Sequence, residues 1–274
     1  IEALSHHLID QFPEGPFDLL DAFAKPLPVI IIARLLGVPE EDADQLLVWS
    51  NAMVAMYQAG RTRQIEDDAS AAALDFTAYL QDVIAAKRKA PADDLISTLI
   101  AASDTGEKLN EDELITTCIL LLNAGHEATV HTIGNGTKTL LETGHRDITD
   151  GCVEEILRFD PPLHMFTRHV YEDVSLGGHD FKRGDQIGCM LAAANRDPLA
   201  YPDPDVFDPS RPIKQNTSFG GGIHFCVGAP LARLELKIAL AALFDRCPSL
   251  AIAAPPQYGN VYHFHGLTAL QVTT

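Results

Sequence analysis

The chain has 274 residues, and 38 acidic residues against 20 basic ones give a formal net charge of −18 at pH 7. This balance excludes a basic protein that tracks nucleic-acid phosphates, and it disfavours adsorption to an anionic membrane. Hydrophobic residues make up 46% of the chain, which is enough for a core and too many for a disordered acidic chain. The 5 cysteines include no CxxC pair, so we expect mostly free thiols and a cytoplasmic protein.

The first half of the chain has the spacing of successive helices. The chain begins at Ile1 within such a pattern and without a capping residue, so we expect its natural start to lie upstream. Acidic residues after a proline open a further helix, and Asp93 and Asp94 cap a short one. The predicted helices are 39–54, 64–88 and 94–100.

The longest predicted helix covers about 110–142. Asn110 and Glu113 form a capping-box pattern at its start, and no proline interrupts the sequence to Glu142. A helix of roughly 32 residues is about 48 Å long. It crosses a whole domain, so we expect a central site beside it.

The second half changes character. A helix over about 153–159 is stopped by Pro161 and Pro162, and strand segments are predicted at 174–176 and 181–189. Recurrent prolines over 197–212 predict ordered coil, and a last helix is expected over about 229–244. No repeat or Gly/Ser-rich linker divides the chain, so residues 1–274 are predicted to form one mainly helical domain with small β-sheets.

Cys226 carries the most specific signal. It follows the glycine run 220–222 and precedes a helix, where free backbone N–H groups favour a thiolate or a metal-bound sulfur. A buried small thiol is the alternative for any single cysteine. A phosphate-binding loop is excluded, because the third glycine and the Lys-Ser/Thr pair of such loops are missing.

A polar stretch, 124–129, interrupts the apolar pattern of the long helix. Burying Glu127 without a partner is costly, so this carboxylate has either a function or solvent access at a helix kink. His126 and His131 are five residues apart and not four, so they do not form the histidine pair of a zinc protease.

Four charged residues are individually weak signals. Glu155 and Arg158 are spaced to meet on a helix, which is by default a surface ion pair. Arg211, in the proline-rich coil, suits the fixing of irregular backbone to a carboxylate. Arg168 is either an anion ligand or a charge at a strand edge.

Together and in this order, these segments resemble the cytochrome P450 family, most closely its soluble bacterial members. The loop 219–228 resembles the haem-thiolate loop, Glu155 to Arg158 resembles the ExxR motif, and 124–129 resembles the oxygen-activating stretch of the central helix. The resemblance implies a P450 fold that is incomplete, because the N-terminal block of the family is missing.

The resemblance also implies residue roles. Cys226 would be the axial thiolate ligand of haem b iron, and His224 and Arg168 would pair with the haem propionates. Other expected cofactor-binding residues are Phe219, Gly220, Gly228, Ala124 and Gly125. Glu127 would relay protons beside Ala128 and Thr129, while Glu155, Arg158 and Arg211 would be structural. The pocket for a small apolar organic substrate would be lined by Leu121, Leu122, His164, Met165 and Phe166.

The implied reaction inserts one oxygen atom from O2 into an organic substrate, with electrons from NAD(P)H through a reductase and a ferredoxin. Ala128 stands where the family has a threonine, so either the substrate supplies a hydroxyl or oxygen activation is poorly coupled. A haem-free, non-catalytic partner protein of the same fold and a haem-thiolate peroxygenase or dehydratase remain as alternatives. The connection 141–150 is shorter than in the family. The missing block would uncover apolar surface, so we expect weak haem binding or dimerisation.

Overall fold

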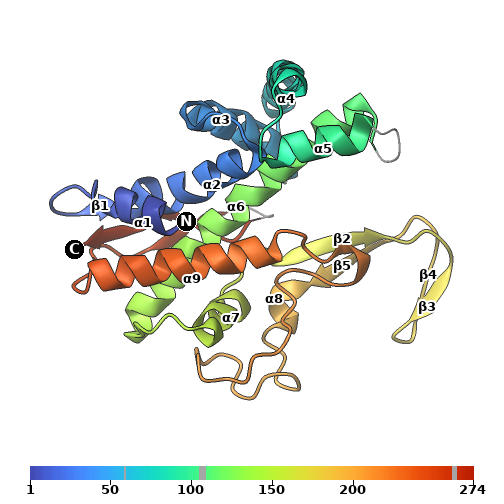
Figure 1. The fold of residues 1–274 in the computed structure, drawn as a ribbon. Helices are drawn as coiled ribbons and strands as arrows, with labels where there is room; N and C mark the ends of the chain where they lie inside the picture. Colours follow the sequence, from blue (N-terminus) through green and yellow to red (C-terminus); the bar gives the residue numbers. More distant parts are fainter. Residues whose placement is uncertain (59, 105–108, 261–263) are drawn as a thin grey trace.

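The structure is a computed structural model, and it describes residues 1–58, 60–104, 109–260 and 264–274. Within these ranges, no helix is both long and apolar enough to cross a membrane. Figure 1 shows a mainly helical molecule with small sheets at its periphery.

The described residues before position 105 form helices α1 to α5, as the spacing of the sequence predicts in outline. The helix predicted over 64–88 is α4, and Thr62 caps it by accepting a hydrogen bond from the Ile65 amide. The helix Pro26–Leu36 was not predicted; its prolines lie in the first turn, where the missing N–H costs no helical hydrogen bond. The bounds are α1 Glu2–Ile9, α2 Pro26–Leu36, α3 Ala43–Val54, α4 Arg63–Lys89 and α5 Leu95–Asp104.

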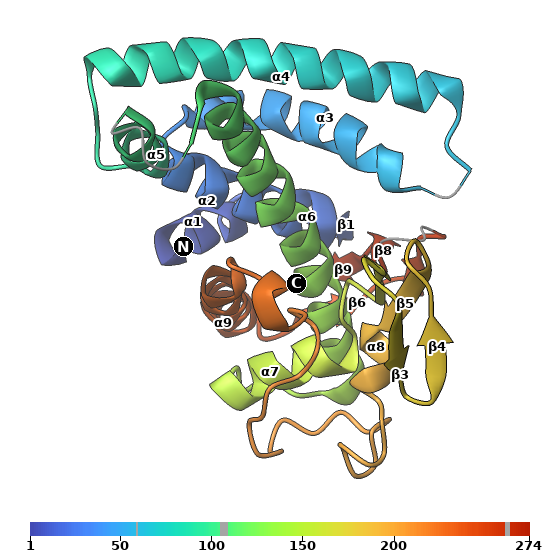
Figure 2. The same ribbon diagram turned by 90° about the vertical axis from the view of Figure 1, so that its right-hand side faces the viewer.

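The long central helix is α6, Glu111–Thr143. The predicted capping box is present: Asn110 accepts from the Glu113 amide at 2.9 Å, and the Glu113 carboxylate accepts from the Asn110 amide at 2.8 Å. Helix α6 contacts α2, α3, α4, α5, α7 and α9, and Figure 2 shows it running through the molecule between these elements. This central position explains why residues on α6 face both apolar cores.

Two predicted boundaries in the second half were wrong. Helix α7, Asp150–Phe159, begins three residues before the predicted start, because the Thr149 side chain caps it by accepting from the Cys152 amide. The strand predicted over 181–189 is divided into β4, His179–Phe181, and β5, Gln186–Met190. A turn at 182–185 separates them, with Gly184 at φ 97°, which an extended strand cannot contain. The last helices are α8 Leu191–Ala194 and α9 Ala229–Arg246.

The sheets are small and antiparallel. A three-stranded sheet has the order β1-β9-β6, and three hairpin-like pairs are β2–β5, β3–β4 and β7–β8. Most of these strands are too short to show an alternating pattern in the sequence, and the C-terminal ones were not predicted. The remaining bounds are β1 Phe17–Asp18, β2 Met165–His169, β3 Val174–Leu176, β6 Ala251–Ile252, β7 Gln257–Tyr258, β8 Leu267–Ala269 and β9 Gln271–Thr273.

The apolar residues form two clusters that share helices α2 and α6. One cluster joins α1, α2, the C-terminal part of α6, α7, α9 and the C-terminal strands. The other joins α2, α3, α4, α5 and the first part of α6. The polar stretch 124–129 lies between the α6 residues of the two clusters.

Candidate functional site

The Cys226 loop is held in shape by its own backbone. The Cys226 amide donates to the Phe219 carbonyl at 2.9 Å, and the Phe225 amide donates to the Gly222 carbonyl at 3.1 Å. Gly220 and Gly222 have φ values of 70° and 65°, which favour glycine. The Cys226 side chain is exposed. The loop therefore presents a thiol on a fixed backbone directly before α9.

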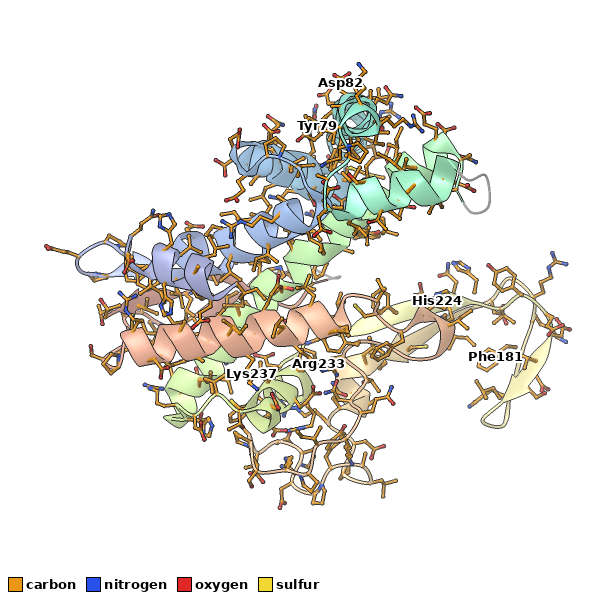
Figure 3. All side chains as sticks on the ribbon, in the orientation of Figure 1. Tyr79, Asp82, Phe181, His224, Arg233 and Lys237 are labelled. Carbon is orange, nitrogen blue, oxygen red and sulfur yellow. The ribbon has the colours of Figure 1, made fainter. Side chains whose placement is uncertain are left out.

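Helix α9 is tied to α7 beneath this loop. The Arg233 guanidinium pairs with the Glu154 carboxylate and lies 4.6 Å from the Phe219 ring centroid. Lys237 pairs with Asp150 at 2.7 Å. Figure 3 shows Arg233 and Lys237 on the side of α9 that faces α7. Arg233 thus fixes Phe219, the first residue of the loop, and also joins α9 to α7.

Glu155 and Arg158 form a buried ion pair and not a surface one. Their side chains are 3% and 2% exposed, and the Arg158 fork donates to both carboxylate oxygens at 2.7 Å. The same guanidinium donates to the carbonyls of Asn195 at 3.0 Å, Pro204 at 2.8 Å and Val206 at 3.2 Å. Arg158 therefore fixes the irregular chain after β5 to helix α7.

Arg211 completes this cluster from the proline-rich coil. Its Nε lies 3.3 Å from Glu155 Oε1, and its other nitrogens donate to the Pro202, Asp203 and Val206 carbonyls at 2.6–3.1 Å. The structure thus brings Glu155, Arg158 and Arg211 together although the third is far away in sequence.

Asn195 links the ion-pair cluster to the Cys226 loop, and the sequence analysis gave it no role. Its side-chain oxygen accepts from the amide and hydroxyl of Thr217, both at 2.8 Å, and its amide nitrogen donates to Ser218 Oγ at 2.8 Å. The Gly220 amide in turn donates to the Thr217 carbonyl at 2.8 Å. The signal in the sequence that could have drawn attention to it is its place in the Ala-Asn-Arg-Asp-Pro segment, 194–198.

Glu127 lies between two histidines of α6. His131 Nε2 is 3.3 Å and His126 Nε2 is 3.5 Å from its carboxylate oxygens. Burial raises the pKa of Glu127, but hydrogen bonds and the charges of His126 and His131 outweigh it, and the pKa falls to about 2. The carboxylate is therefore partnered and ionised at neutral pH, and the histidines that fail as a zinc pair both contact it.

Thr129 and Glu235 meet where α6 and α9 cross. Thr129 is 6% exposed and hydrogen-bonds Glu235, which is 1% exposed. Burial raises the pKa of Glu235 to about 8, and the positive charge of the N-terminal amine and the Thr129 hydrogen bond oppose this only partly. Glu235 is a buried titratable group that the sequence analysis missed, since a glutamate in an α9 pattern looks like a surface residue.

Gly125 and Leu122 of α6 both lie against neighbouring helices. A Cβ on Gly125 would lie 3.0 Å from the Ile32 side chain, so the close approach at Gly125 is to α2. Leu122 is 1% exposed and packs in the second apolar cluster, which includes residues of α4. Ala124 is exposed and Leu120 is 63% exposed, and they mark the open side of the helix.

His224 and Arg168 are both exposed. Figure 3 shows His224 on the loop before α9, toward the end of the molecule where β2 and β5 lie. Arg168 is on β2, opposite Ile187 of β5, and donates to the Thr167 carbonyl at 2.9 Å. Among the described residues, neither side chain pairs with a carboxylate, so both are available to an anion.

The remaining pocket candidates lie at or directly before the start of β2, except Leu121, which lies on α6. Met165 and Phe166 are half-buried and pair with Met190 and Cys189 of β5, and Leu121 packs partly against the second core cluster. The pKa of His164 is lowered, first by burial and then by repulsion from His265. Met165 and Phe166 are therefore two half-buried apolar side chains that follow His164 directly in the chain.

Comparison with known proteins identifies the family. A model of the cytochrome P450 family matches residues 134–251. Polyketide biosynthesis cytochrome P450 PksS of Bacillus subtilis (strain 168) is 38% identical over 286 residues, spanning 100% of this chain and 69% of the relative. Vitamin D(3) 25-hydroxylase of Pseudonocardia autotrophica is 42% identical over 252 residues, with 88% and 60% coverage.

A solved structure agrees closely with the fold. P450BioI, in complex with an acyl carrier protein that carries hexadec-9Z-enoic acid, superposes with a TM-score of 0.92 at 37% identity. It covers 98% of this chain, while the chain covers 72% of that structure. The expected family and mainly helical fold are confirmed, as is the shortness of the chain relative to its relatives. The chain belongs to the cytochrome P450 family of monooxygenases.

Proposed function

We propose that this protein is a haem-thiolate monooxygenase that inserts one oxygen atom from O2 into a small apolar organic substrate. The observation that carries the proposal is the exposed Cys226 thiol on a backbone-fixed loop. The Glu155–Arg158–Arg211 cluster, in which Glu155 and Arg158 are buried, ties this loop to α7 through Asn195. A structural cysteine would not need this support, because buried thiols are held by packing alone.

The residues around Cys226 suit haem b. Three exposed side chains of the loop are apolar, with Ile223 97%, Val227 85% and Phe225 40% exposed. Helices α6 and α9 cross at Thr129 and Glu235, and from there the loop and the Leu120–Ala124 segment diverge (Figure 1). An apolar macrocycle between them would cover surface that a folded protein otherwise rarely exposes. His224 and Arg168 would pair with the propionates.

Cys226 would hold the iron through its thiolate, and the iron would then supply the activation of O2. The loop backbone orients the sulfur, and Phe219 under the Arg233 guanidinium fixes the start of the loop. The role of Glu155, Arg158 and Arg211 would be to hold the coil 197–212 and, through Asn195, the base of the loop. None of these three needs to contact a substrate.

Proton movement would depend on Glu127. Its ionised carboxylate can accept a proton and pass it toward the open side of α6 at Ala124. Ala128 has no hydroxyl, and the Thr129 hydroxyl is buried against Glu235. A hydroxyl that orders the final water would therefore come from the substrate. Leu121, His164, Met165 and Phe166 would bound an apolar pocket with one polar contact.

Electrons would come from NAD(P)H through a separate reductase and a ferredoxin, in the cytoplasm. We further propose that residues 1–274 act as one domain. Haem binding by the chain on its own would be weak, or the chain would dimerise. The dimer would cover the apolar surface that is covered, in the longer relatives, by the segment that has no counterpart in this chain.

The reduced carbon-monoxide difference spectrum tests the proposal. We expect the red-shifted Soret band of thiolate-ligated haem, which Cys226→Ser abolishes and the control Cys189→Ser leaves intact. Because the chain on its own is expected to bind haem weakly, haem is added in excess, and absence of the band even then would favour the haem-free alternative. Labelled O2 then separates monooxygenation from peroxygenation and dehydration, since only a monooxygenase transfers an atom of the labelled gas into product.

A further inference from the structure

Asp160, His164 and His265 form a cluster outside the Cys226 site. Their side chains are half-buried, and one potential ligand atom from each lies within 4.8 Å of those of the other two. His265 Nε2 and Asp160 Oδ1 are 3.2 Å apart. The ligands of a tetrahedral zinc ion lie about 3.3 Å apart, as bond lengths of roughly 2.0–2.1 Å require. One pair of the cluster already has that separation.

The backbone that carries the cluster is fixed by a β-bridge and by hydrogen bonds from Asn135. Leu163 and Phe264 form an antiparallel bridge, and the His265 amide donates to the Pro162 carbonyl at 2.7 Å. The buried Asn135 of α6 donates to the His265 carbonyl at 2.9 Å and to the Asp160 carbonyl at 3.3 Å. The segment after α7 and the segment before β8 therefore lie side by side, and Asn135 fixes both of them to helix α6.

Each of the three side chains has an orienting partner. The Tyr258 hydroxyl donates to Asp160 Oδ2, and the Tyr258 ring stacks on His265 at 4.1 Å. The His164 ring hydrogen-bonds the Pro161 carbonyl, which leaves its other ring nitrogen for a ligand. A metal-binding histidine commonly donates its second nitrogen to a backbone carbonyl or carboxylate in this way, and a ligating carboxylate is itself hydrogen-bonded.

We propose that Asp160, His164 and His265 bind one divalent transition-metal ion, with zinc as the preferred occupant and a water or a fourth ligand completing a tetrahedron. Two imidazoles and one carboxylate favour such an ion over Mg²⁺ or Ca²⁺, which prefer oxygen ligands. His164 stacks on His265 with ring centroids 4.1 Å apart. Binding therefore requires the His164 ring to turn its free nitrogen toward the ion. The site would fasten the start of β2 to the C-terminal segment.

Equilibrium dialysis and calorimetric titration of the purified chain with Zn²⁺ test the proposal. We expect one ion per chain from this site, with binding weakened at least tenfold by Asp160→Asn, His164→Asn or His265→Asn. Tyr258→Phe keeps the ring that stacks on His265 and removes only the hydroxyl, so it is expected to weaken binding by about tenfold. Circular dichroism of each variant distinguishes loss of the site from loss of the fold.

Three further measurements separate this site from other zinc-binding groups. His179→Asn is a matched control, because His179 is exposed on β4, and it is expected to leave the affinity unchanged. Cys226→Ser and the pair His6→Asn and His7→Asn identify any ions held by the exposed thiol or the N-terminal histidines. Co²⁺ bound at the site is expected to show intense tetrahedral visible bands that His265→Asn removes. Zinc binding that is absent, or that survives all three ligand substitutions, overturns the proposal.

Discussion

Replacing Arg158 by alanine tests whether the buried cation fixes the chain that supports the Cys226 loop. Arg158 is 2% exposed, and its loss would leave the Glu155 carboxylate, 3% exposed, with Arg211 Nε at 3.3 Å as its remaining cationic partner. It would also leave carbonyls of Asn195, Pro204 and Val206 without this donor. Breaking a buried ion pair from one side costs about 3–5 kcal/mol. We expect Arg158→Ala to lower the free energy of unfolding by this amount.

Urea unfolding followed by circular dichroism measures the loss, and thermal unfolding should shift by roughly 10 °C. Arg34→Ala is the matched control: Arg34 also donates two hydrogen bonds to one carboxylate, that of Glu40, at 2.6 and 2.9 Å. Those side chains are 46% and 48% exposed, so water replaces the lost partner and the expected cost is below about 1 kcal/mol. Equal losses in the two variants would refute the argument that burial sets the cost.

Three further predictions concern titration and backbone conformation. The pKa of Glu235 is about 8 in the folded protein, above that of an unfolded glutamate, so its contribution to stability falls as pH rises from about 4.5 to 8. Glu235→Gln removes this dependence, and a parallel pH profile of urea midpoints for both proteins would contradict it. His131→Asn removes one partner of Glu127 and should raise the pKa of that carboxyl above about 2, as followed by carbon-13 NMR. An unchanged pKa would show that the His131 contact does not cause the lowered pKa of Glu127. Gly220→Ala places a side chain at φ 70° and should lower the free energy of unfolding by about 1 kcal/mol, as measured by thermal unfolding. Gly221→Ala is the control and should not lower it, because Gly221 has φ −165° and no atom lies within 4 Å of the added Cβ. Equal losses of stability in the two variants would refute the strain argument.

Helix α6 was predictable because its signals are local. The capping box at Asn110 and the unbroken pattern to Glu142 depend only on neighbours in sequence, and the helix that forms is Glu111–Thr143. Helix α2 and the C-terminal strands were missed for the opposite reason. A strand as short as Ala251–Ile252 is stabilised by its pairing with β9 rather than by its own residues.

The candidate site shows the same division. The Cys226 loop and the Glu155–Arg158 spacing were visible as motifs in the sequence. Each motif also has an ordinary interpretation, however: a charged pair at this spacing is by default a surface ion pair, and a single cysteine is by default a buried thiol. The structure removes that ambiguity for Glu155 and Arg158 by burying both, and for Glu127 by placing two histidines against it. Asn195 and Glu235 escaped notice because their importance lies in partners that are distant along the chain.

The sequence by itself determined the family, the central helix and the order of the motifs, because motifs and helix caps are read over a few consecutive residues. Only the tertiary structure decided which charges are buried, that Gly125 packs on α2, and that Asp160, His164 and His265 lie together. These facts arise where segments far apart in sequence exclude water from one another. Desolvation changes both the cost of a charge and its partners, and it has no signature in the order of residues.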